Sequence, residues 1–341
     1  MKAINLLFHY NFGGAEKVAE NYSHIFNIHG VKVKSLALKG DKNSCSDIEI
    51  VSNKVSYLRY CLSNLKYNDI IICHCNFSLL ITIFCMLFTN LKNSKKYYVQ
   101  HLEYTPWKRA ILYRIINLFF DGFIEIKNES YPEINLISRT KIIPIHNFTT
   151  NNIKVSLNET EKDAVLKTNE AKMNGDKIIL FVGSAKEGKG INHLITISKY
   201  LSKLNFKYKI LFVGDGPLLF EFKNQINMDE SIADSFIFSG FSSSPEKFIQ
   251  LSNIMIFPSD KSEVTPMVVL EALDNNLPVT AFDFLFNQRY LPSQCLFKIN
   301  MIHEMAEYIM NGDYTIIKNM YNQEYAISRF IELIGDTHAR N

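Results

Sequence analysis

Strand-length apolar segments alternate with helix-length segments twice along this chain, and this double rhythm constrains its fold more than any other feature. The first series runs from "AINLLFH" to "TKIIPIH", and the second runs from "KIILFVG" to "LPVTAFD". Nearly continuous apolar strands separated by helices are typical of parallel sheets that helices cover on both faces. The sequence therefore predicts an α/β protein with two doubly wound, Rossmann-like parallel sheets.

A polar stretch at residues 151–176 separates the two series and lacks a strong period. It indicates a domain junction that carries one exposed helix. We expect an N-terminal domain over residues 1–160, a C-terminal domain over 175–323, and a helix at 324–341 that completes the first domain. Because ligands bind beyond the carboxyl ends of parallel strands, a cleft between the domains is the expected binding site.

Charge, cysteine content and hydropathy exclude several classes of protein. The net charge is only +3 and no block of five like charges occurs, which argues against a nucleic-acid partner. The six cysteines are scattered, as in proteins of a reducing compartment without disulfides. The longest apolar run, Phe77–Phe88, is shorter than the roughly 18 residues that span a bilayer. A soluble or peripheral cytoplasmic protein is expected.

The triplet Cys73-His74-Cys75 permits two interpretations. Its residue types are those of a metal site, but no second ligand pair is evident in the sequence. The triplet also follows the apolar run "DIII", where alternate residues of a strand point to opposite faces. The favoured interpretation is the buried end of a strand, with the two cysteines on one face and His74 on the other. No metal is expected.

Three glycine-rich turns follow predicted strands. "NFGGAEK" carries Gly13 and Gly14 directly before a helix, "FVGSAKEGKG" carries two lysines, and "FVGDGP" ends on Pro217, a residue suited to the first position of a helix. Glycine lets a ligand approach the backbone, and the amides of a helix N-terminus attract anions. Each turn could be only a tight turn. Together, at successive strand ends of one sheet, they indicate a nucleotide diphosphate.

The stretch "FPSDKSEVTPMVVLEALDNNLPV" places two glutamates on either side of a proline. Thr265 suits an N-cap and Pro266 a first helical residue, so Glu263 would lie just before the helix and Glu271 inside it. A carboxylate among apolar neighbours needs partners, because burying it alone is costly. The two hydroxyls of a ribose would supply them. A salt bridge or partial exposure is the alternative.

These residues resemble those of the retaining glycosyltransferases of family four, which have the GT-B fold. Glu263 and Glu271 match the two glutamates of that family within its "P-S…E…P…EA…PV" context. The motifs "VG…KG", "VGDGP" and "SGF" precede them in the family's order. "GGAEK", Gln100-His101 and "IHNF" match in the first half. The resemblance covers nearly the whole chain.

The resemblance implies a function for each matched position. Glu271 would bind the ribose, Glu263 and the amides after it would hold the donor sugar, and Lys189 would stabilise the leaving diphosphate. The segment Ser239–Phe241 would contact the base, and His101 would approach the sugar near its anomeric carbon. No cofactor or metal is implied. With the glycine turns, the expected donor-binding residues besides Glu271 are Gly13, Gly14, Ser184, Lys186, Gly214, Gly240, Phe241, Val264, Thr265, Pro266 and Met267.

Two positions depart from the family pattern. Ser184 stands where the family usually has arginine, and Val264 stands where glycine commonly follows the first glutamate. The first departure concerns contacts to phosphate, and the second concerns contacts to the sugar. The missing arginine also keeps a second hypothesis open, a non-catalytic protein that binds sugar nucleotides or glycans on the same fold.

Thr105–Phe123 suits a helix that carries both apolar and basic residues. The apolar residues Trp107, Ile111, Ile115, Leu118 and Phe119 recur at helical spacing, and the basic residues nearby are Lys92, Lys95, Lys96, Lys108, Arg109 and Arg114. Such a composition suits an anionic membrane surface. Core packing with solvated charges is the alternative interpretation.

The combined prediction is a retaining, metal-independent sugar transferase that uses a nucleotide-diphosphate sugar, with UDP as the expected nucleotide. Its expected acceptor is a lipid-linked saccharide in the synthesis of bacterial O-antigen, capsule or lipopolysaccharide. The enzyme would lie on the cytoplasmic face of the inner membrane. A transferase that acts on a soluble acceptor remains a further alternative.

Overall fold

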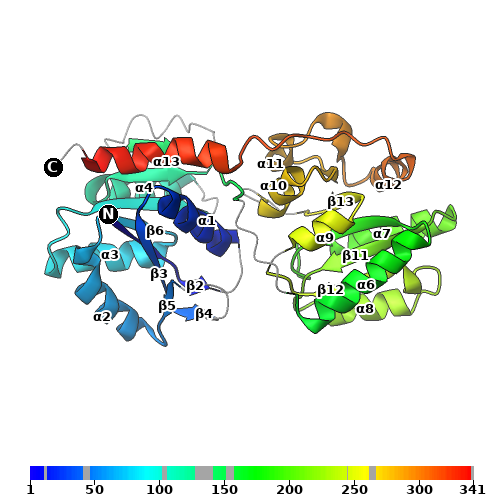
Figure 1. The fold of residues 1–341 in the computed structure, drawn as a ribbon, viewed down its shortest axis with the longest axis horizontal. Coiled ribbons are helices and arrows are strands. Elements are labelled where there is room, and N and C mark those ends of the chain that lie inside the picture. The colour runs from blue at the N-terminus through cyan, green and yellow to red at the C-terminus, as the bar shows by residue number, and fades with distance from the viewer. Residues whose placement is uncertain are drawn as a thin grey trace. The chain divides into compact units, whose positions relative to one another are not determined.

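The chain forms two compact units, each built around its own parallel sheet (Figure 1). Unit 1 comprises Met1–Asn151 and Tyr321–Asn341, and unit 2 comprises Asn152–Met320. The computed structural model describes residues 1–10, 14–40, 47–101, 106–126, 141–150, 157–243, 245–260 and 266–338. The prediction of two doubly wound parallel sheets is confirmed.

The sheet of unit 1 has seven parallel strands in the order β5-β3-β1-β6-β7-β8-β9. Its strands are β1 (Lys2–Leu6), β3 (Lys32–Ala37), β5 (Ile48–Ile50), β6 (Ile70–Cys73), β7 (Lys95–Gln100), β8 (Gly122–Glu125) and β9 (Lys141–Pro144). Two further short strands, β2 (His9–Tyr10) and β4 (Lys39–Gly40), pair beyond the carboxyl ends of β1 and β3. Pro144 lies in edge strand β9, where proline is tolerated.

Helices cover both faces of this sheet. They are α1 (Gly14–Ile28), α2 (Lys54–Asn64), α3 (Asn76–Phe88), α4 (Pro106–Phe119) and α13 (Gln323–His338). Strand side chains alternate between the faces. Ile4 and Leu6 of β1 therefore join the core that α2, α3 and α4 cover, whereas Asn5 bonds to α1 on the other face. α13 packs beside α1 there, with the ring of Phe330 against Tyr22 and Phe26.

Helix α4 buries one side and exposes an apolar other side. Its buried residues include Leu112 and Ile116, while Trp107 and Leu118 are 62% and 74% exposed. Ile111 and Phe119 are exposed as well, so the interpretation of the predicted apolar stripe as core is wrong for four of its five residues. Ile115 of the stripe packs against the core, and the other core contacts of the helix come from residues that the stripe did not include.

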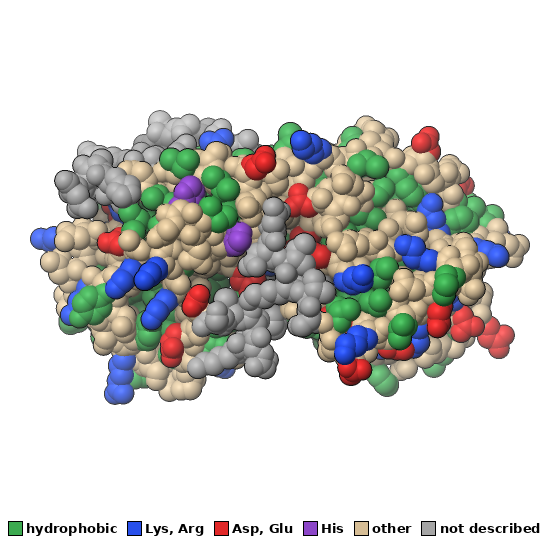
Figure 2. All heavy atoms as spheres, viewed as in Figure 1, with side chains coloured by type: hydrophobic (Ala, Val, Ile, Leu, Met, Phe, Trp, Pro, Cys, Tyr) green, Lys and Arg blue, Asp and Glu red, His purple; other side chains and the backbone are tan. Residues whose placement is uncertain are grey.

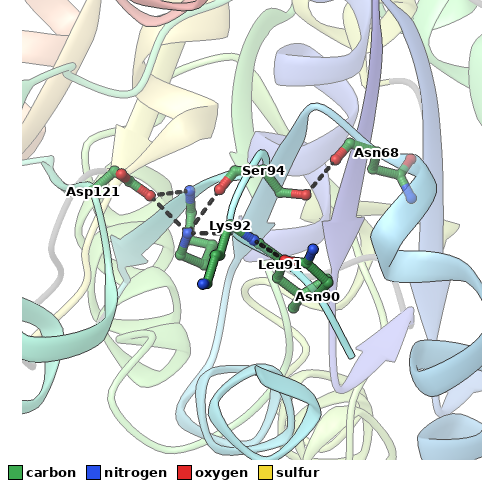
Figure 3. A network of polar contacts seen from close by, with 7 residues as sticks. Asn68, Asn90, Leu91, Lys92, Ser94 and Asp121 are labelled. Carbon is green, nitrogen blue, oxygen red and sulfur yellow. Dashed lines mark hydrogen bonds and ion pairs between the residues drawn. The ribbon is translucent and has the colours of Figure 1, made fainter. Parts of the chain in front are cut away.

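The predicted cluster of basic residues near α3 and α4 is only partly a surface feature. Lys96 is buried, and its Nζ lies 3.0 Å from Asp121 Oδ2 and donates to the Ser94 carbonyl at 2.7 Å. The Ser94 hydroxyl in turn donates to the Asn68 carbonyl at 2.7 Å (Figure 3). Lys96 therefore lies buried near the amino end of β7 and does not face solvent. Lys92, by contrast, is exposed.

The sheet of unit 2 has six parallel strands in the order β12-β11-β10-β13-β14-β15. They are β10 (Lys177–Val182), β11 (Tyr208–Val213), β12 (Phe236–Gly240), β13 (Ile254–Phe257), β14 (Val279–Phe282) and β15 (Leu296–Phe297). The helices of this unit are α6 (Glu159–Met173), α7 (Ile191–Lys203), α8 (Leu219–Asn227), α9 (Glu246–Leu251), α10 (Met267–Asp274), α11 (Leu285–Gln288) and α12 (Ile302–Asn311).

Helix α6 corrects the prediction of an exposed helix at the junction. It begins with a capping box in which Asn158 Oδ1 accepts from the Glu161 amide and Glu161 Oε2 accepts from the Asn158 amide. It then packs on β10, β11 and β12 through the buried residues Ala164, Thr168 and Ala171. These small side chains let the helix approach the sheet, although its sequence is too polar to suggest burial.

Candidate functional site

Three glycine-rich turns of unit 2 lie side by side at the carboxyl ends of β10, β11 and β12. The Gly183 amide donates to the Val213 carbonyl at 3.0 Å, and the Gly214 amide donates to the Gly240 carbonyl at 2.8 Å. Because these strands are neighbours in the sheet, the bonds join consecutive turns. The prediction that glycine turns meet at successive strand ends of one sheet is confirmed for "FVGSAKEGKG" and "FVGDGP", and "SGF" lies beside them. It is wrong for "NFGGAEK", because Gly14 begins α1 in unit 1, which has a separate sheet.

The backbone in these turns packs too closely for side chains. Gly190 has a φ of +68°, and a Cβ there would lie 1.7 Å from the Pro258 carbonyl oxygen. A Cβ on Gly214 would lie 1.9 Å from the Gly183 carbonyl oxygen. Both contacts are shorter than any real Cβ contact, so these positions require glycine. The carboxyl edge of the sheet is therefore held rigidly by backbone contacts.

Helix α7 begins at Ile191, as predicted, with Gly190 as an N-cap that has no side-chain hydrogen bond to the helix. Its first amides carry the positive end of the helix dipole. Lys189 directly precedes this cap and is half-buried, Lys186 is exposed, and Ser184 is half-buried. The turn thus combines a helix N-terminus with two cations, an arrangement suited to an anionic group.

Residues after β13 form hydrogen bonds with the turn that precedes α7. The Ser259 hydroxyl donates to the Gly188 carbonyl at 2.9 Å, and the Asp260 amide donates to it at 3.2 Å. Asp260 Oδ2 lies 3.7 Å from His193 Nε2 in α7. Burial lowers the pKa of His193, and the neighbouring Asp260 carboxylate opposes that shift. These contacts fix the end of β13 against the start of α7.

Helix α10 places Glu271 in a buried position. Glu271 is 8% exposed, and its neighbours Leu270 and Ala272 are fully buried, so the predicted carboxylate inside an apolar helix is confirmed. The predicted helix start is wrong: Pro266 has a ψ of 100°, outside the helical range, and the helix begins at Met267. Pro266 and Met267 are themselves buried. Glu263, Val264 and Thr265 lie outside the described residues.

Two other predicted positions are found at the strand ends. Gly240 ends β12 with a φ of +70°, and Phe241 beyond it is partly exposed. Helix α8 begins at Leu219, so the prediction that Pro217 is its first residue is wrong. The Leu218 amide donates to the Ala185 carbonyl at 2.9 Å, which holds the chain in a turn before the helix can start.

Unit 1 holds the remaining predicted residues. Gly14 is the first residue of α1, and a Cβ there would meet no heavy atom within 4 Å, while Gly13 lies outside the described residues. His101 follows β7, and its Nε2 lies 3.0 Å from His74 Nδ1. Burial lowers the pKa of His101 to about 4, so its ring is neutral at physiological pH.

Comparison with known proteins matches the unit that carries the three turns. Residues 163–310 match the family model of "Glycosyl transferases group 1". The matched residues lie within unit 2, so the similarity to this family concerns that unit. An uncharacterized glycosyltransferase of Haemophilus influenzae is 28% identical over 152 residues, which are 44% of this chain. The aligned segment spans 41% of that relative.

Solved structures resemble the whole chain. Anabaena Alr3699/HepE, solved in complex with UDP and glucose, aligns with a TM-score of 0.76 at 15% identity over 98% of this chain and all of that one. The lipopolysaccharide outer core galactosyltransferase WaaB aligns with a TM-score of 0.64 at 18% identity over 98% of this chain and 99% of that one. At these identities the likeness concerns the fold, and with the two parallel-sheet units it establishes the GT-B fold.

The predicted residues fall into two groups. Unit 2 holds Ser184, Lys186, Lys189, Gly214, Gly240, Phe241, Pro266, Met267 and Glu271, while unit 1 holds Gly14 and His101. Ser259, Asp260 and His193 of unit 2 were not predicted from the sequence. The available signal for Ser259 and Asp260 was that they are polar and follow the buried strand "IMIF" and Pro258.

Within the described part of the chain, no cluster of three histidine, cysteine or acidic side chains could hold a metal ion. No described helix has both the length and the hydropathy to cross a bilayer. The alternation predicted for the cysteine–histidine triplet is confirmed for its first two residues, since Cys73 Sγ contacts Thr82 of α3 while His74 lies on the α1 face of the sheet beside Asn5. Cys75 lies beyond the strand and is the N-cap of α3.

Proposed function

We propose that this chain is a retaining, metal-independent glycosyltransferase that transfers a sugar from a nucleotide diphosphate to a lipid-linked glycan in bacterial surface-polysaccharide synthesis. The observation that carries the proposal is the row of three bonded glycine turns within the residues that match the model of "Glycosyl transferases group 1". The N-terminus of α7 and the two lysines before it suit a diphosphate. UDP is favoured as the nucleotide because the similar HepE structure contains UDP and glucose.

Each residue of the site receives a role. Lys189 and the first amides of α7 bind the diphosphate and stabilise its charge as the bond from the anomeric carbon to the phosphate oxygen breaks. Glu271 accepts hydrogen bonds from the ribose hydroxyls, and Ser239–Phe241 contacts the base. Glu263 and the residues after it hold the donor sugar, and the acceptor hydroxyl forms the new glycosidic bond. The alternative, a non-catalytic nucleotide-binding protein, would keep the binding roles without turnover.

Replacing Glu271 by alanine should weaken UDP binding about 10- to 150-fold. Its carboxylate is the acceptor for the ribose hydroxyls, and hydrogen bonds to a charged group contribute roughly 1.5 to 3 kcal/mol. Titration calorimetry with UDP measures the effect, and circular dichroism checks that the variant is folded. Glu271→Gln keeps the shape but not the charge and should lie between wild type and alanine.

The exposed glutamate Glu221 of α8 provides the matched control. Glu221→Ala should bind UDP as the wild type does. Equal UDP affinity in folded Glu271→Ala would rule out the ribose role.

An exposed surface of unit 1 supports membrane attachment. α3 exposes Leu80, Phe84, Leu87 and Phe88, and α4 exposes Trp107, Ile111, Leu118 and Phe119. Both helices cover the same face of the sheet. Lys92, Lys108 and Arg114 are exposed on or beside them. Figure 2 shows hydrophobic side chains beside lysine and arginine side chains over the part of unit 1 where α2 and α3 lie. We infer peripheral binding to the cytoplasmic face of an anionic membrane, near a lipid-linked acceptor.

Replacing Lys108 and Arg114 by glutamine should reduce partitioning onto phosphatidylglycerol vesicles about 30-fold at low salt. Each basic residue near an anionic surface contributes roughly 1 kcal/mol. Trp107→Ser with Leu118→Ser should also release the protein, because these side chains supply the apolar contact. Vesicle sedimentation measures partitioning, and calorimetry with UDP should show unchanged donor affinity.

Lys203→Gln with Lys207→Gln, at exposed positions of unit 2, is the charge-matched control and should partition as the wild type does. Equal partitioning of all these variants would favour an enzyme that acts on a soluble acceptor.

A further inference from the structure

Three polar side chains from neighbouring strands of unit 1 form one chain of hydrogen bonds that ends at His101. Asn5 lies in β1, His74 follows β6, and His101 follows β7, and these strands are adjacent in the sheet. His74 Nε2 lies 3.1 Å from Asn5 Oδ1, and His74 Nδ1 lies 3.0 Å from His101 Nε2. The ring of Tyr22 in α1 packs edge-on against that of His74, with the ring centroids 5.7 Å apart.

Contacts with α1 determine which atoms donate and which accept in this series of hydrogen bonds. The Asn5 side-chain amide lies 3.2 Å from the Ala19 carbonyl, which can only accept a hydrogen bond. It also lies 2.9 Å from the Ser23 hydroxyl, whose own proton goes to the Ala19 carbonyl. The NH₂ group of Asn5 must therefore face α1, so its Oδ1 faces His74.

Each following bond takes its direction from the one before. Asn5 Oδ1 can only accept, so His74 Nε2 carries a proton and donates it. His74 is 4% exposed, and its burial, with His101 nearby, holds its pKa well below the usual value. Its ring is therefore neutral, and Nδ1 has a lone pair. His101 Nε2 must then donate to that lone pair.

We propose that Asn5 and His74 are positioning residues that hold His101 in its Nε2-protonated tautomer, so that His101 offers Nδ1 as an acceptor to a hydroxyl group of the donor sugar. The ligand part of this proposal rests on the function proposed above. His101 is only half-buried, and within the described ranges no group bonds to its Nδ1.

Because these hydrogen bonds leave Nδ1 of His101 as an acceptor, they also determine which ligand groups can bind to it. Phosphate oxygens at neutral pH are acceptors and would face the lone pair of Nδ1, which is unfavourable. A sugar hydroxyl can donate to it. His101 is therefore assigned to the sugar and not to the diphosphate. A donor lacking that hydroxyl would leave Nδ1 without its bond.

Nitrogen NMR of protein labelled with ¹⁵N-histidine tests the tautomers directly and needs no substrate. At pH 7 the rings of His74 and His101 should both be protonated at Nε2 and unprotonated at Nδ1, with His101 assigned from the loss of its signals in His101→Gln. Asn5→Leu removes the acceptor of His74 and should leave His101 as a mixture of tautomers. Ser23→Ala is the control, because the Ala19 carbonyl still orients Asn5. A wild-type His101 protonated at Nδ1 would overturn the proposal.

Calorimetry with UDP-glucose and with UDP tests the ligand part. Asn5→Leu should weaken UDP-glucose binding roughly fivefold, the scale of one neutral hydrogen bond, and should leave UDP binding unchanged. Ser23→Ala should change neither. A merely structural role for Asn5 would weaken both ligands alike, and a wild type that binds UDP and UDP-glucose equally would refute the sugar contact. Failure to bind either ligand would instead count against the proposed function, whereas the tautomers would still be measured.

Discussion

Replacing Lys189 by alanine should lower the turnover of this chain by a hundredfold or more. Lys189 directly precedes the N-cap of α7. In the proposed function, the departing diphosphate would gain charge there. Loss of one group that stabilises such charge costs about 2.7 to 4 kcal/mol in the transition state. The loss should be large here because Ser184 stands where the resembled family has arginine. Turnover with saturating UDP-sugar and a lipid-linked acceptor is the measurement.

Two other lysines provide comparisons for that result. Lys186→Ala should cost less than Lys189→Ala, because Lys186 lies farther from the helix start on an exposed part of the turn. Lys203→Ala, at the opposite end of α7, should have no effect. Turnover of Lys189→Ala within threefold of wild type would remove its assigned role. A wild type that binds UDP-sugars but neither transfers nor hydrolyses them would establish the binding-protein alternative.

Phe330→Ala should lower the free energy of unfolding of unit 1 by about 3 to 5 kcal/mol, the usual range for deleting a buried phenylalanine ring. The ring is fully buried and packs against Tyr22, Phe26 and Phe148. Denaturant unfolding is followed by a signal from each unit, because two units need not unfold in one step. The transition of unit 2 should not move.

The next residue of the same helix supplies the control. Ile331 is 56% exposed, so Ile331→Ala should change stability by less than about 0.5 kcal/mol. Equal effects of the two substitutions would mean that α13 contributes only its backbone to unit 1.

The strands of both sheets could be predicted because their local sequence determines them. Segments such as "KIILFVG" and "DIIICHC" are apolar enough to be buried on both faces, and they form β10 and β6. The glycine turns followed from the same logic, since a turn directly after a buried strand must lie at the carboxyl edge. The family resemblance added roles for particular residues. It did not alter the expected architecture.

The features that could not be predicted depend on contacts distant in the sequence. α8 begins after Pro217 because the Leu218 amide bonds to Ala185 in a neighbouring turn. Lys96 of β7 can be buried because it pairs with Asp121. Asp121 follows α4 and comes just before β8, the strand beside β7. The pairing of His74 with Asn5 and His101 needs the strand order β1-β6-β7. No local pattern contains this information.

The position of α13 determines the order in which the two units can be completed on the ribosome. Unit 2 is continuous, whereas unit 1 awaits a helix from the end of the chain. At about 5 to 20 residues per second, synthesis of unit 2 leaves the partners of Phe330 uncovered for roughly 10 to 30 seconds. During that interval Tyr22, Phe26 and Phe148 lack their last neighbour. The unit made first is therefore the last to finish folding, and its nascent surface is where chaperones would be needed.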